Sequence, residues 1–315
     1  MGDWGVVMRT IAWAKVNLTL AVAPRADDGY HPLRSIFLRI GLADELSVEQ
    51  VAGDADELRV DGLPGCPVDG NLVLRAFELI RAEVAVALPA LSAQLHKQVP
   101  IGAGLGGGSS DGAAALELAL ATWGIGLPAA RVEELALELG ADVPFFLADT
   151  PAALVEGRGE RIVALPAVRA GAGVLLATFA APLSTAAVFA AFDGLSVDTA
   201  PASVATDELA DALAAGLDGA RLADRAAELR DANSLWPAAV ALAPELGSAR
   251  DALESATDMP WLLTGSGRSL FSLHRSPEAA VDVGRSLAAG PAGETSDVVF
   301  YAVGLDGASP AWRST

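Results

Sequence analysis

The sequence is poor in cysteine, in lysine and in basic residues generally. Cys66 is the single cysteine of 315 residues, which excludes an intrachain disulfide and fits a reducing compartment. The 21 basic residues against 40 acidic ones form no run, so the concentrated basic face of a nucleic-acid-binding protein is excluded. No uncharged apolar stretch reaches the length of a membrane span, and the start lacks the basic segment of a signal peptide. We therefore expect a cytoplasmic protein without nucleic-acid or membrane partners.

Apolar residues are abundant by comparison. They make up 52% of the chain, and no long polar or repetitive tract interrupts them. Disordered chains have the opposite balance, so this composition predicts a packed globular protein. The net charge of -19 serves solubility and says little about the fold. An acidic protein that binds anionic ligands must place its few positive charges locally.

Strand and helix patterns interleave along the whole chain. Alternating or β-rich segments predict strands over 10–23, 35–40, 44–51, 91–99, 152–155, 160–165 and 174–179. Apolar spacing and capping residues predict a helix that opens after Asn71 and helices over 112–122, 131–139 and 185–192. A stretch rich in Ala, Leu and Asp predicts a helical region over 207–229. A small-residue segment at 169–173 separates the two halves of this pattern. The sequence predicts an α+β protein of two domains, 1–165 and 166–315.

A glycine-rich loop at 102–110 is the strongest chemical signal in the sequence. Glycines allow successive backbone N–H groups to converge on an anion, since no Cβ atoms stand in the way. Ser109, Ser110 and Asp111 then supply hydroxyls and an N-cap for the helix that follows. A loop that leads into a helix N-terminus is a phosphate-binding arrangement.

Other glycine motifs fit this loop less well. Gly102, Gly104 and Gly107 satisfy the spacing G-x-G-x-x-G, but Pro100 interrupts the strand that should lead in, and no acidic residue follows at the expected distance. No lysine follows the glycines, so the Walker pattern fails as well. A flexible linker would not open a periodic apolar helix.

Lysine occurs only at Lys15 and Lys97, and the other 19 basic residues are arginines. A compact ammonium suits a point contact with phosphate, for which the planar fork of arginine is less suited. Lys97 stands just before the loop, and Lys15 lies in the middle of an apolar strand, where an exposed position is disfavoured. Both lysines are candidates for a phosphate site, with an ordinary solvated position as the alternative.

Five segments together resemble the GHMP kinase superfamily, named for galactokinase, homoserine, mevalonate and phosphomevalonate kinases. They are 12–18 (A-W-A-K-V-N-L), 28–31 (D-G-Y-H), 100–110, 139–146 (L-G-A-D-V-P-F-F) and 264–267 (T-G-S-G). The glycine loop marks the superfamily. The second and fourth segments resemble the family within it that phosphorylates 4-diphosphocytidyl-2-C-methyl-D-erythritol in the non-mevalonate isoprenoid pathway.

The resemblance implies a fold and a reaction. The fold is a ribosomal-protein-S5-domain-2-like ATP-binding domain followed by a ferredoxin-like α+β domain. ATP with Mg²⁺ serves as the donor, and the 2-hydroxyl of the substrate receives the γ-phosphoryl group. The substrate carries a cytidine diphosphate group. The Mg²⁺ ligands and the choice between monomer and dimer stay open.

The resemblance also implies roles for residues around ATP. Asp142 accepts the proton of the hydroxyl, and Lys15 lies beside it as the second catalytic residue. A neighbouring ammonium keeps a carboxylate ionised and stabilises charge on the moving phosphoryl group. Asn71 lies near the adenosine. The residues that surround the ATP phosphates are Pro100, Gly102, Gly104, Leu105, Gly106, Gly107, Gly108, Ser109 and Ser110.

On the substrate side the resemblance implies a site for cytidine. Tyr30 and Phe189 enclose the cytosine ring, and His31 hydrogen-bonds its edge. Further substrate-binding residues are Asn17, Lys97 and Thr185. Outside their motifs these residue types are ordinary: a tyrosine beside a glycine packs in turns, and a phenylalanine on a helix belongs to a core.

Three departures from the family pattern leave questions open. The turn before Tyr30 is longer by one aspartate, Gly112 replaces an alanine of the loop helix, and the segment 233–237 has lost two acidic residues. We expect a glycine at 112 to weaken the start of that helix, and we assign no role to 233–237.

Two alternative functions stay open. The first is a GHMP kinase of the homoserine or mevalonate type, and the second is a non-catalytic small-molecule sensor of the same fold.

Overall fold

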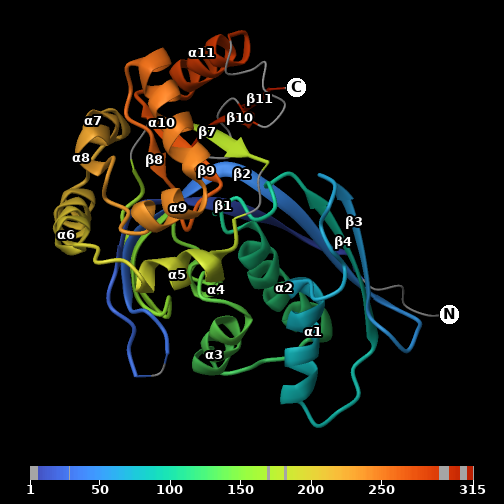
Figure 1. Ribbon diagram of the computed structural model, residues 1–315. Helices are drawn as coiled ribbons and strands as arrows, with labels where there is room; N and C mark the ends of the chain where they lie inside the picture. Colours follow the sequence, from blue (N-terminus) through green and yellow to red (C-terminus); the bar gives the residue numbers. More distant parts are fainter. Residues whose placement is uncertain are drawn as a thin grey trace. The chain divides into compact units, whose positions relative to one another are not determined.

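A computed structural model describes residues 6–27, 29–168, 171–180, 183–290, 298–305 and 311–314. Strands and helices interleave along these residues, which confirms the α+β class (Figure 1). Contacts divide the chain into unit 1 (Met1–Ala14, Leu42–Ile101 and Gly106–Asp149) and unit 2 (Lys15–Gly41, Gly102–Leu105 and Thr150–Thr315). Both units consist of several separate segments of the chain. We predicted instead two continuous domains that meet at residue 165, and that division stays a prediction.

Strands β1 (Met8–Val22) and β2 (Leu33–Val51) each contribute residues to both units. In unit 1 the second part of β2 pairs antiparallel with β4 (Ala90–Lys97), and β4 pairs parallel with β3 (Glu57–Gly62). One strand replaces the two that we predicted at 35–40 and 44–51. The alternation of buried and half-buried residues continues through Gly41, so nothing interrupts the pleat there.

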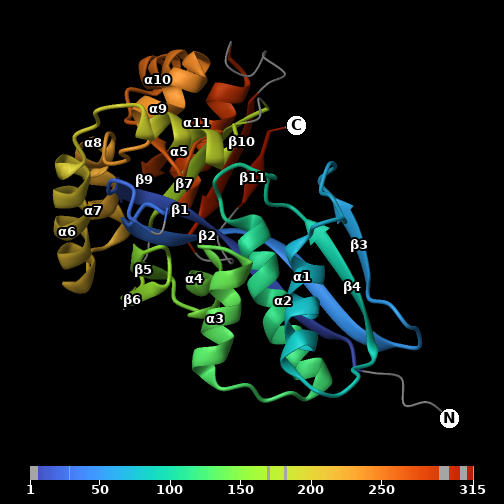
Figure 2. The ribbon, with the colours of Figure 1, turned by 60° about the horizontal axis from the view of Figure 1, so that its bottom comes forward.

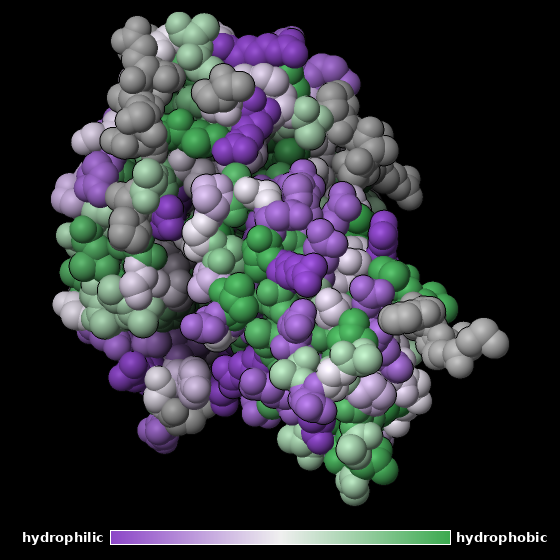
Figure 3. Space-filling model, turned by 90° about the vertical axis from the view of Figure 1, so that its right-hand side faces the viewer, coloured by the Kyte–Doolittle hydropathy of each residue, from purple (hydrophilic) through white to green (hydrophobic). Residues whose placement is uncertain are grey.

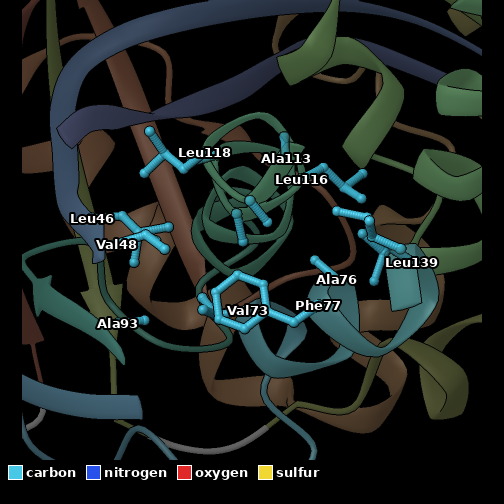
Figure 4. Packing of buried hydrophobic residues seen from close by; sticks show 14 of the residues in the cluster. Leu46, Val48, Val73, Ala76, Phe77, Ala93, Ala113, Leu116, Leu118 and Leu139 are labelled. Atoms are coloured by element: carbon cyan, nitrogen blue, oxygen red, sulfur yellow. The ribbon is translucent and has the colours of Figure 1, made fainter. Parts of the chain in front are cut away.

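Four helices complete unit 1: α1 (Leu72–Glu83), α2 (Gly107–Trp123), α3 (Ala129–Leu139) and α4 (Val143–Leu147). Helices α1 and α2 lie side by side in both ribbon views (Figure 2). Figure 4 shows Phe77 of α1 next to α2, with Leu46 and Val48 of β2 on one side and Leu139 of α3 on the other. These buried apolar side chains form the core of unit 1.

Gly112 lies in the second turn of α2, because that helix begins five residues earlier than we predicted. A Cβ at this position would lie 3.1 Å from the Cβ of Leu72, the first residue of α1. The glycine therefore permits close packing of α1 on α2. It does not lie in the first turn of the helix as we expected, and its effect on the stability of the helix stays a prediction.

Unit 2 contains a second sheet in the order β11-β10-β7-β9-β8, antiparallel throughout. Its strands are β7 (Gly173–Phe179), β8 (Leu262–Leu263), β9 (Ser269–His274), β10 (Val298–Gly304) and β11 (Trp312–Arg313). The first part of β2 pairs with β5 (Ala152–Gly157), which pairs with β6 (Arg161–Leu165). The core of unit 2 includes Trp261, which is fully buried.

Helices α5 (Thr185–Asp193), α9 (Trp236–Leu242), α10 (Pro244–Thr257) and α11 (Pro277–Ala288) also belong to unit 2. The helical region predicted over 207–229 consists of three helices: α6 (Ala200–Ala214), α7 (Gly219–Asp224) and α8 (Ala226–Leu229). Gly216 adopts a left-handed φ of 87° after α6, and the Asp218 carboxylate accepts a hydrogen bond from the Arg221 N–H to cap α7.

Polar and apolar residues are interspersed on the face that Figure 3 draws. Several large apolar side chains are nevertheless exposed in the described part of the chain, among them Val86, Val204 and Val163. Single exposed side chains of this kind are normal for a folded protein. Among the helices that the structure describes, none is long and apolar enough to cross a bilayer.

Candidate active site

Three glycines give the loop at 102–106 its conformation. Gly102, Gly104 and Gly106 have φ values of 66°, 77° and 72°, a left-handed region that side chains with a Cβ rarely adopt. Helix α2 then begins at Gly107. The predicted loop-to-helix arrangement is therefore present, although the helix starts within the glycine run and not after Asp111.

The N-terminus of α2 has no side-chain cap. Its N-cap residue is Gly106, whereas we expected Ser109, Ser110 or Asp111 in that role. Those three residues lie in the first turns of the helix because the left-handed Gly106 already turns the chain into it. The first N–H groups of a helix have no carbonyl partner within it. An uncapped start leaves them for a ligand, and a phosphate fits there by charge and by geometry.

Two further glycines of the loop differ in their surroundings. A Cβ at Gly107 would lie 2.8 Å from Cγ1 of Val99, so this position is packed. A Cβ at Gly108 would meet no atom within 4 Å. A side chain at Gly108 would therefore point into open space at the start of α2.

In unit 2 the loop packs against the second glycine turn, Thr264–Gly267. A Cβ on Gly104 would lie 2.7 Å from the carbonyl oxygen of Thr264. The Thr264 hydroxyl lies 3.3 Å from the Gly104 carbonyl oxygen and accepts a hydrogen bond of 3.1 Å from the backbone N–H of Asn17. Thr264 thus joins the loop to β1. Sequence reasoning noted its motif but did not include it among the site residues.

Lys15 and Asn17 lie together beside this contact. The Lys15 backbone N–H donates to the carbonyl of Leu105 over 2.9 Å, which ties β1 to the loop. Its side chain is 2% exposed, and Nζ donates to Oδ1 of Asn17 over 2.6 Å and lies 4.3 Å from the ring centre of Phe37. Asn17 in turn donates to the hydroxyl of Ser35. These contacts hold a buried ammonium at the loop.

Lys97 is the centre of a buried charge cluster in unit 1. Its Nζ donates to the carboxylates of Asp44 and Asp111, and all three side chains are at most 3% exposed. Burial opposes its charged form, but the two carboxylates outweigh burial and raise the pKa of Lys97. The described contacts of this ammonium are with carboxylates of the chain, so a contact with substrate stays a prediction.

The two carboxylates of this cluster lie on either side of the loop in the chain's contacts: Asp44 binds the residues before the loop, and Asp111 belongs to the helix after it. Asp44 accepts hydrogen bonds from the backbone N–H groups of Gln98 and Val99, at the end of β4. Asp111 lies in α2, and burial together with Asp44 raises its pKa to about 7, although Lys97 acts in the opposite direction. Its Oδ1 is buried without a hydrogen-bond partner. The cluster therefore connects the chain before the loop with the helix after it.

Asp142 lies at the junction of α3 and α4 in unit 1. It occupies the N-cap position of α4, but its side chain makes no capping hydrogen bond. The residue is half-buried, as a proton acceptor that a substrate must reach has to be. A Cβ at Gly140, two residues earlier, would lie 3.9 Å from the Ser109 hydroxyl of α2. The turn that carries Asp142 is therefore next to the first turn of the loop helix.

Asn71 is the N-cap of α1, as the sequence predicts. Its Oδ1 accepts from the Val73 N–H over 3.0 Å, and its Nδ2 donates to the carbonyl of Pro67. The amide lies within 3.6 Å of the thiol of Cys66 as well. These contacts explain the residue as a helix cap, and its role near adenosine stays a prediction. Among the described residues, no three His, Cys, Asp or Glu side chains form a group that could hold a metal ion.

The residues predicted to bind the substrate lie in unit 2, apart from Lys97. Tyr30 is 54% exposed, and the guanidinium of Arg158 lies 3.8 Å from its ring centre. His31 is buried, and its ring packs against Phe189 at 5.4 Å between centroids. Its Nδ1 lies 2.9 Å from the Ala23 carbonyl oxygen. The aspartate of this motif, Asp28, lies outside the described residues.

Thr185 and the segment 233–237 both contact the second glycine turn. The Thr185 hydroxyl lies 2.9 Å from the hydroxyl of Ser266. The buried amide of Asn233 donates to the carbonyls of Leu263 and Gly265. The segment to which we assigned no role therefore holds the turn that contacts the loop. Asn233 could have indicated this structural role, since a buried amide needs hydrogen-bond partners.

The chain is similar in sequence to known kinases. A model of the GHMP kinases N terminal domain matches residues 71–155. A 4-diphosphocytidyl-2-C-methyl-D-erythritol kinase of Thermobifida fusca is 39% identical over 295 residues, 91% of this chain and 92% of that protein. The kinase of the same name from Pelotomaculum thermopropionicum is 38% identical over 280 residues, 88% of this chain and 93% of that protein.

The fold is also similar to solved structures of kinases. A crystal structure of 4-(cytidine 5'-diphospho)-2C-methyl-D-erythritol kinase matches with a TM-score of 0.65 at 30% identity, over 97% of this chain and 98% of that one. Mevalonate kinase of Methanococcus jannaschii matches with a TM-score of 0.67 over 96% of this chain and 99% of that one. At 13% identity the second match shows the fold alone.

The fold and the glycine loop thus define a small-molecule kinase of the GHMP class. Within that class the chain belongs to the 4-diphosphocytidyl-2-C-methyl-D-erythritol kinase family. Both levels of the resemblance seen in the sequence are confirmed, and so is the two-domain GHMP kinase fold that it implies.

Proposed function

We propose that this chain phosphorylates the 2-hydroxyl of 4-diphosphocytidyl-2-C-methyl-D-erythritol at the expense of ATP, giving the 2-phosphate and ADP of the non-mevalonate isoprenoid pathway. The observation that carries the proposal is the tie between Lys15 and the glycine loop. The loop ends in the uncapped N-terminus of α2, and the strand that carries the buried ammonium is hydrogen-bonded to the loop at Leu105. An ammonium fixed next to a phosphate-binding loop is what phosphoryl transfer requires.

The loop residues bind and orient the donor. The N–H groups of Gly107, Gly108 and Ser109 open α2 without a side-chain cap, so they are the groups that hold the ATP phosphates. ATP, bound with Mg²⁺, supplies the γ-phosphoryl group. Mg²⁺ in such sites takes phosphate and water oxygens with only one or two ligands from the chain, so a large cluster of carboxylates is not needed.

Asp142 and Lys15 act on the substrate hydroxyl. The half-buried Asp142 carboxylate accepts the hydroxyl proton, and the Lys15 ammonium stabilises the negative charge that develops in the transition state. Asn17 orients Lys15, since its Oδ1 accepts a hydrogen bond from that ammonium. Positioning and electrostatics supply most of the catalysis in phosphoryl transfer, so two such groups suffice.

Tyr30 and Phe189 bind the cytosine between them. The described contacts of the His31 side chain are with the carbonyl of Ala23, with Asp193 and with aromatic rings of α5. The hydrogen bonds to the cytosine edge are therefore assigned to the backbone of His31. Thr185 and Asn17 remain the proposed contacts with the rest of the substrate, and a cytoplasmic location remains a prediction.

An ATP-consumption assay with three alcohols tests the proposal. We expect turnover with the diphosphocytidyl alcohol and none with mevalonate or homoserine. Turnover with either of the others would assign the chain to another GHMP activity. Turnover with none of them would favour a non-catalytic sensor.

A binding experiment tests the cytidine site independently of turnover. We expect CDP to raise the melting temperature of the wild-type chain and of Tyr30→Phe, which keeps the ring, but not of Tyr30→Ala. Equal protection of Tyr30→Ala would remove Tyr30 from the site.

A further inference from the structure

Asp193 is an acidic residue at an unfavourable place in its helix. It is the last residue of α5, where the partial negative charge of the helix end repels a carboxylate. Helix stability therefore does not explain an aspartate there. Its contacts outside the helix do.

Two cationic or ionisable side chains of the segment between β1 and β2 meet this carboxylate. Nε2 of His31 lies 3.0 Å from Oδ1 of Asp193, and Nε of Arg25 lies 3.7 Å from Oδ2. The His31 side chain is only 5% exposed, while those of Asp193 and Arg25 are 35% and 59% exposed. The contact between His31 and Asp193 is not a hydrogen bond, because the buried Nε2 has no partner in hydrogen-bond geometry.

His31 connects α5 to the base of the 23–32 segment. Its Nδ1 lies 2.9 Å from the Ala23 carbonyl, and the Ala23 N–H donates to the carbonyl of Pro32. The ring also packs against Phe189 and Phe192, at 5.4 and 5.8 Å between centroids. The imidazole is therefore fixed from both sides, by the segment and by the helix.

The same two elements carry the aromatic residues proposed to hold cytosine. Tyr30 directly precedes His31. Phe189 precedes Asp193 by four residues, so both lie on one face of α5. A carboxylate that holds His31 and Arg25 to α5 therefore sets where Tyr30 stands relative to Phe189.

We propose that Asp193 is a positioning residue for recognition of the cytosine base, which it serves by holding the 23–32 segment to α5 through His31 and Arg25. The inference rests on the proposed function, because only a cytidine-containing substrate needs the two aromatic side chains at a fixed separation. Asp193 itself need not contact the substrate.

The test compares Asp193→Asn with Asp251→Asn, a change at an exposed aspartate of α10 in the same unit. For Asp193→Asn we expect the KM for the diphosphocytidyl alcohol to rise about tenfold, with the KM for ATP unchanged and kcat within about threefold, since the weakened polar contacts with His31 and Arg25 act on positioning. CDP should protect this variant less than wild type against heat. Asp251→Asn should behave as wild type.

A double variant shows whether Asp193 acts through Tyr30. Because the effect passes through one side chain, Asp193→Asn should add little to Tyr30→Ala. Arg25→Gln removes only the exposed contact and should raise the same KM about twofold, so it tests the inference even if Asp193→Asn does not fold.

The outcomes separate the inference from the proposed function. If CDP protects wild type and Asp193→Asn equally, or if the KM for ATP rises as much as that for the alcohol, the inference is wrong and the proposed function stands. If CDP does not protect wild type at all, the cytidine site and the inference are both wrong, and the turnover assay alone decides the proposed function.

Discussion

Gly104 lies so close to Thr264 that a Cβ on the glycine would stand 2.7 Å from the threonine carbonyl oxygen. Gly104→Ala must also adopt a φ of 77°, which costs an alanine about 1 to 2 kcal/mol. We therefore expect this variant to unfold at lower denaturant concentration, with a loss of about 2 kcal/mol or more. Chemical denaturation measures the change.

Gly108→Ala is the matched control within the same loop. Its Cβ would meet no atom of the chain within 4 Å, and the residue is already helical. We expect unchanged or slightly higher stability but a raised KM for ATP, since the Cβ would enter the space that we assign to phosphate. Equal loss of stability in the two variants would contradict this account of the loop.

Asp142→Asn should lower kcat by about a thousandfold or more while ATP and CDP still bind, because an amide cannot accept the hydroxyl proton. Its side chain caps no helix, so the fold should survive. Steady-state kinetics and thermal protection by CDP measure the two halves of this prediction. Glu133→Gln, at an exposed position of α3, serves as control, and a mutant that kept most of its kcat would remove Asp142 from the base role.

Lys15→Met should lower kcat by about 100-fold to 10,000-fold, the range found when a group that stabilises transition-state charge is removed. Lys15→Arg should not restore it. The side chain is 2% exposed and its Nζ is held by Asn17 at 2.6 Å, so a planar guanidinium has neither the room nor the geometry. Full activity of the arginine variant would show that only the charge matters.

Asp111 should make stability fall as the pH rises. Its pKa is about 7 in the folded protein against 3.8 for an unperturbed aspartate, so between these values the folded state binds more protons than the unfolded state. This contribution is complete below the unperturbed value, partly lost at pH 6 and nearly absent at pH 8, and between pH 6 and pH 8 it falls by about 1 kcal/mol. Denaturation at the two pH values should show a smaller difference for Asp111→Asn, and an unchanged difference would show that the carboxyl ionises normally.

The motifs singled out several residues that the structure brings together, although the roles of these residues stay predictions. The uncapped helix start and the contact of Lys15 with Asn17 involve motif residues, whereas Phe189, which packs against His31, lies outside the motifs. The cluster of Lys97 could not be predicted, because its carboxylates come from positions 44 and 111 and meet only in the folded chain. A lysine before a glycine loop reads as a phosphate ligand until the partners of its ammonium are known.

Element boundaries failed where glycine is ambiguous. The run at 106–108 reads as loop, yet two of its members open α2, since glycine fits a helix start as well as a turn. The predicted gap between the strands 35–40 and 44–51 was also wrong, because the alternation of burial continues across Gly41. We predicted 207–229 as a helical region without dividing it, and in the structure Gly216 follows the end of one helix and Asp218 caps the start of the next.

The interleaved composition of the two units has a consequence for dissecting this enzyme. Each unit takes segments from places that alternate along the chain, with changes at Ala14, Gly41, Ile101, Leu105 and Asp149. A single proteolytic cut, or a single stop codon, therefore cannot produce either unit complete. A fragment made by truncation would contain parts of both units. The role of each unit therefore has to be tested with point variants of the full-length chain.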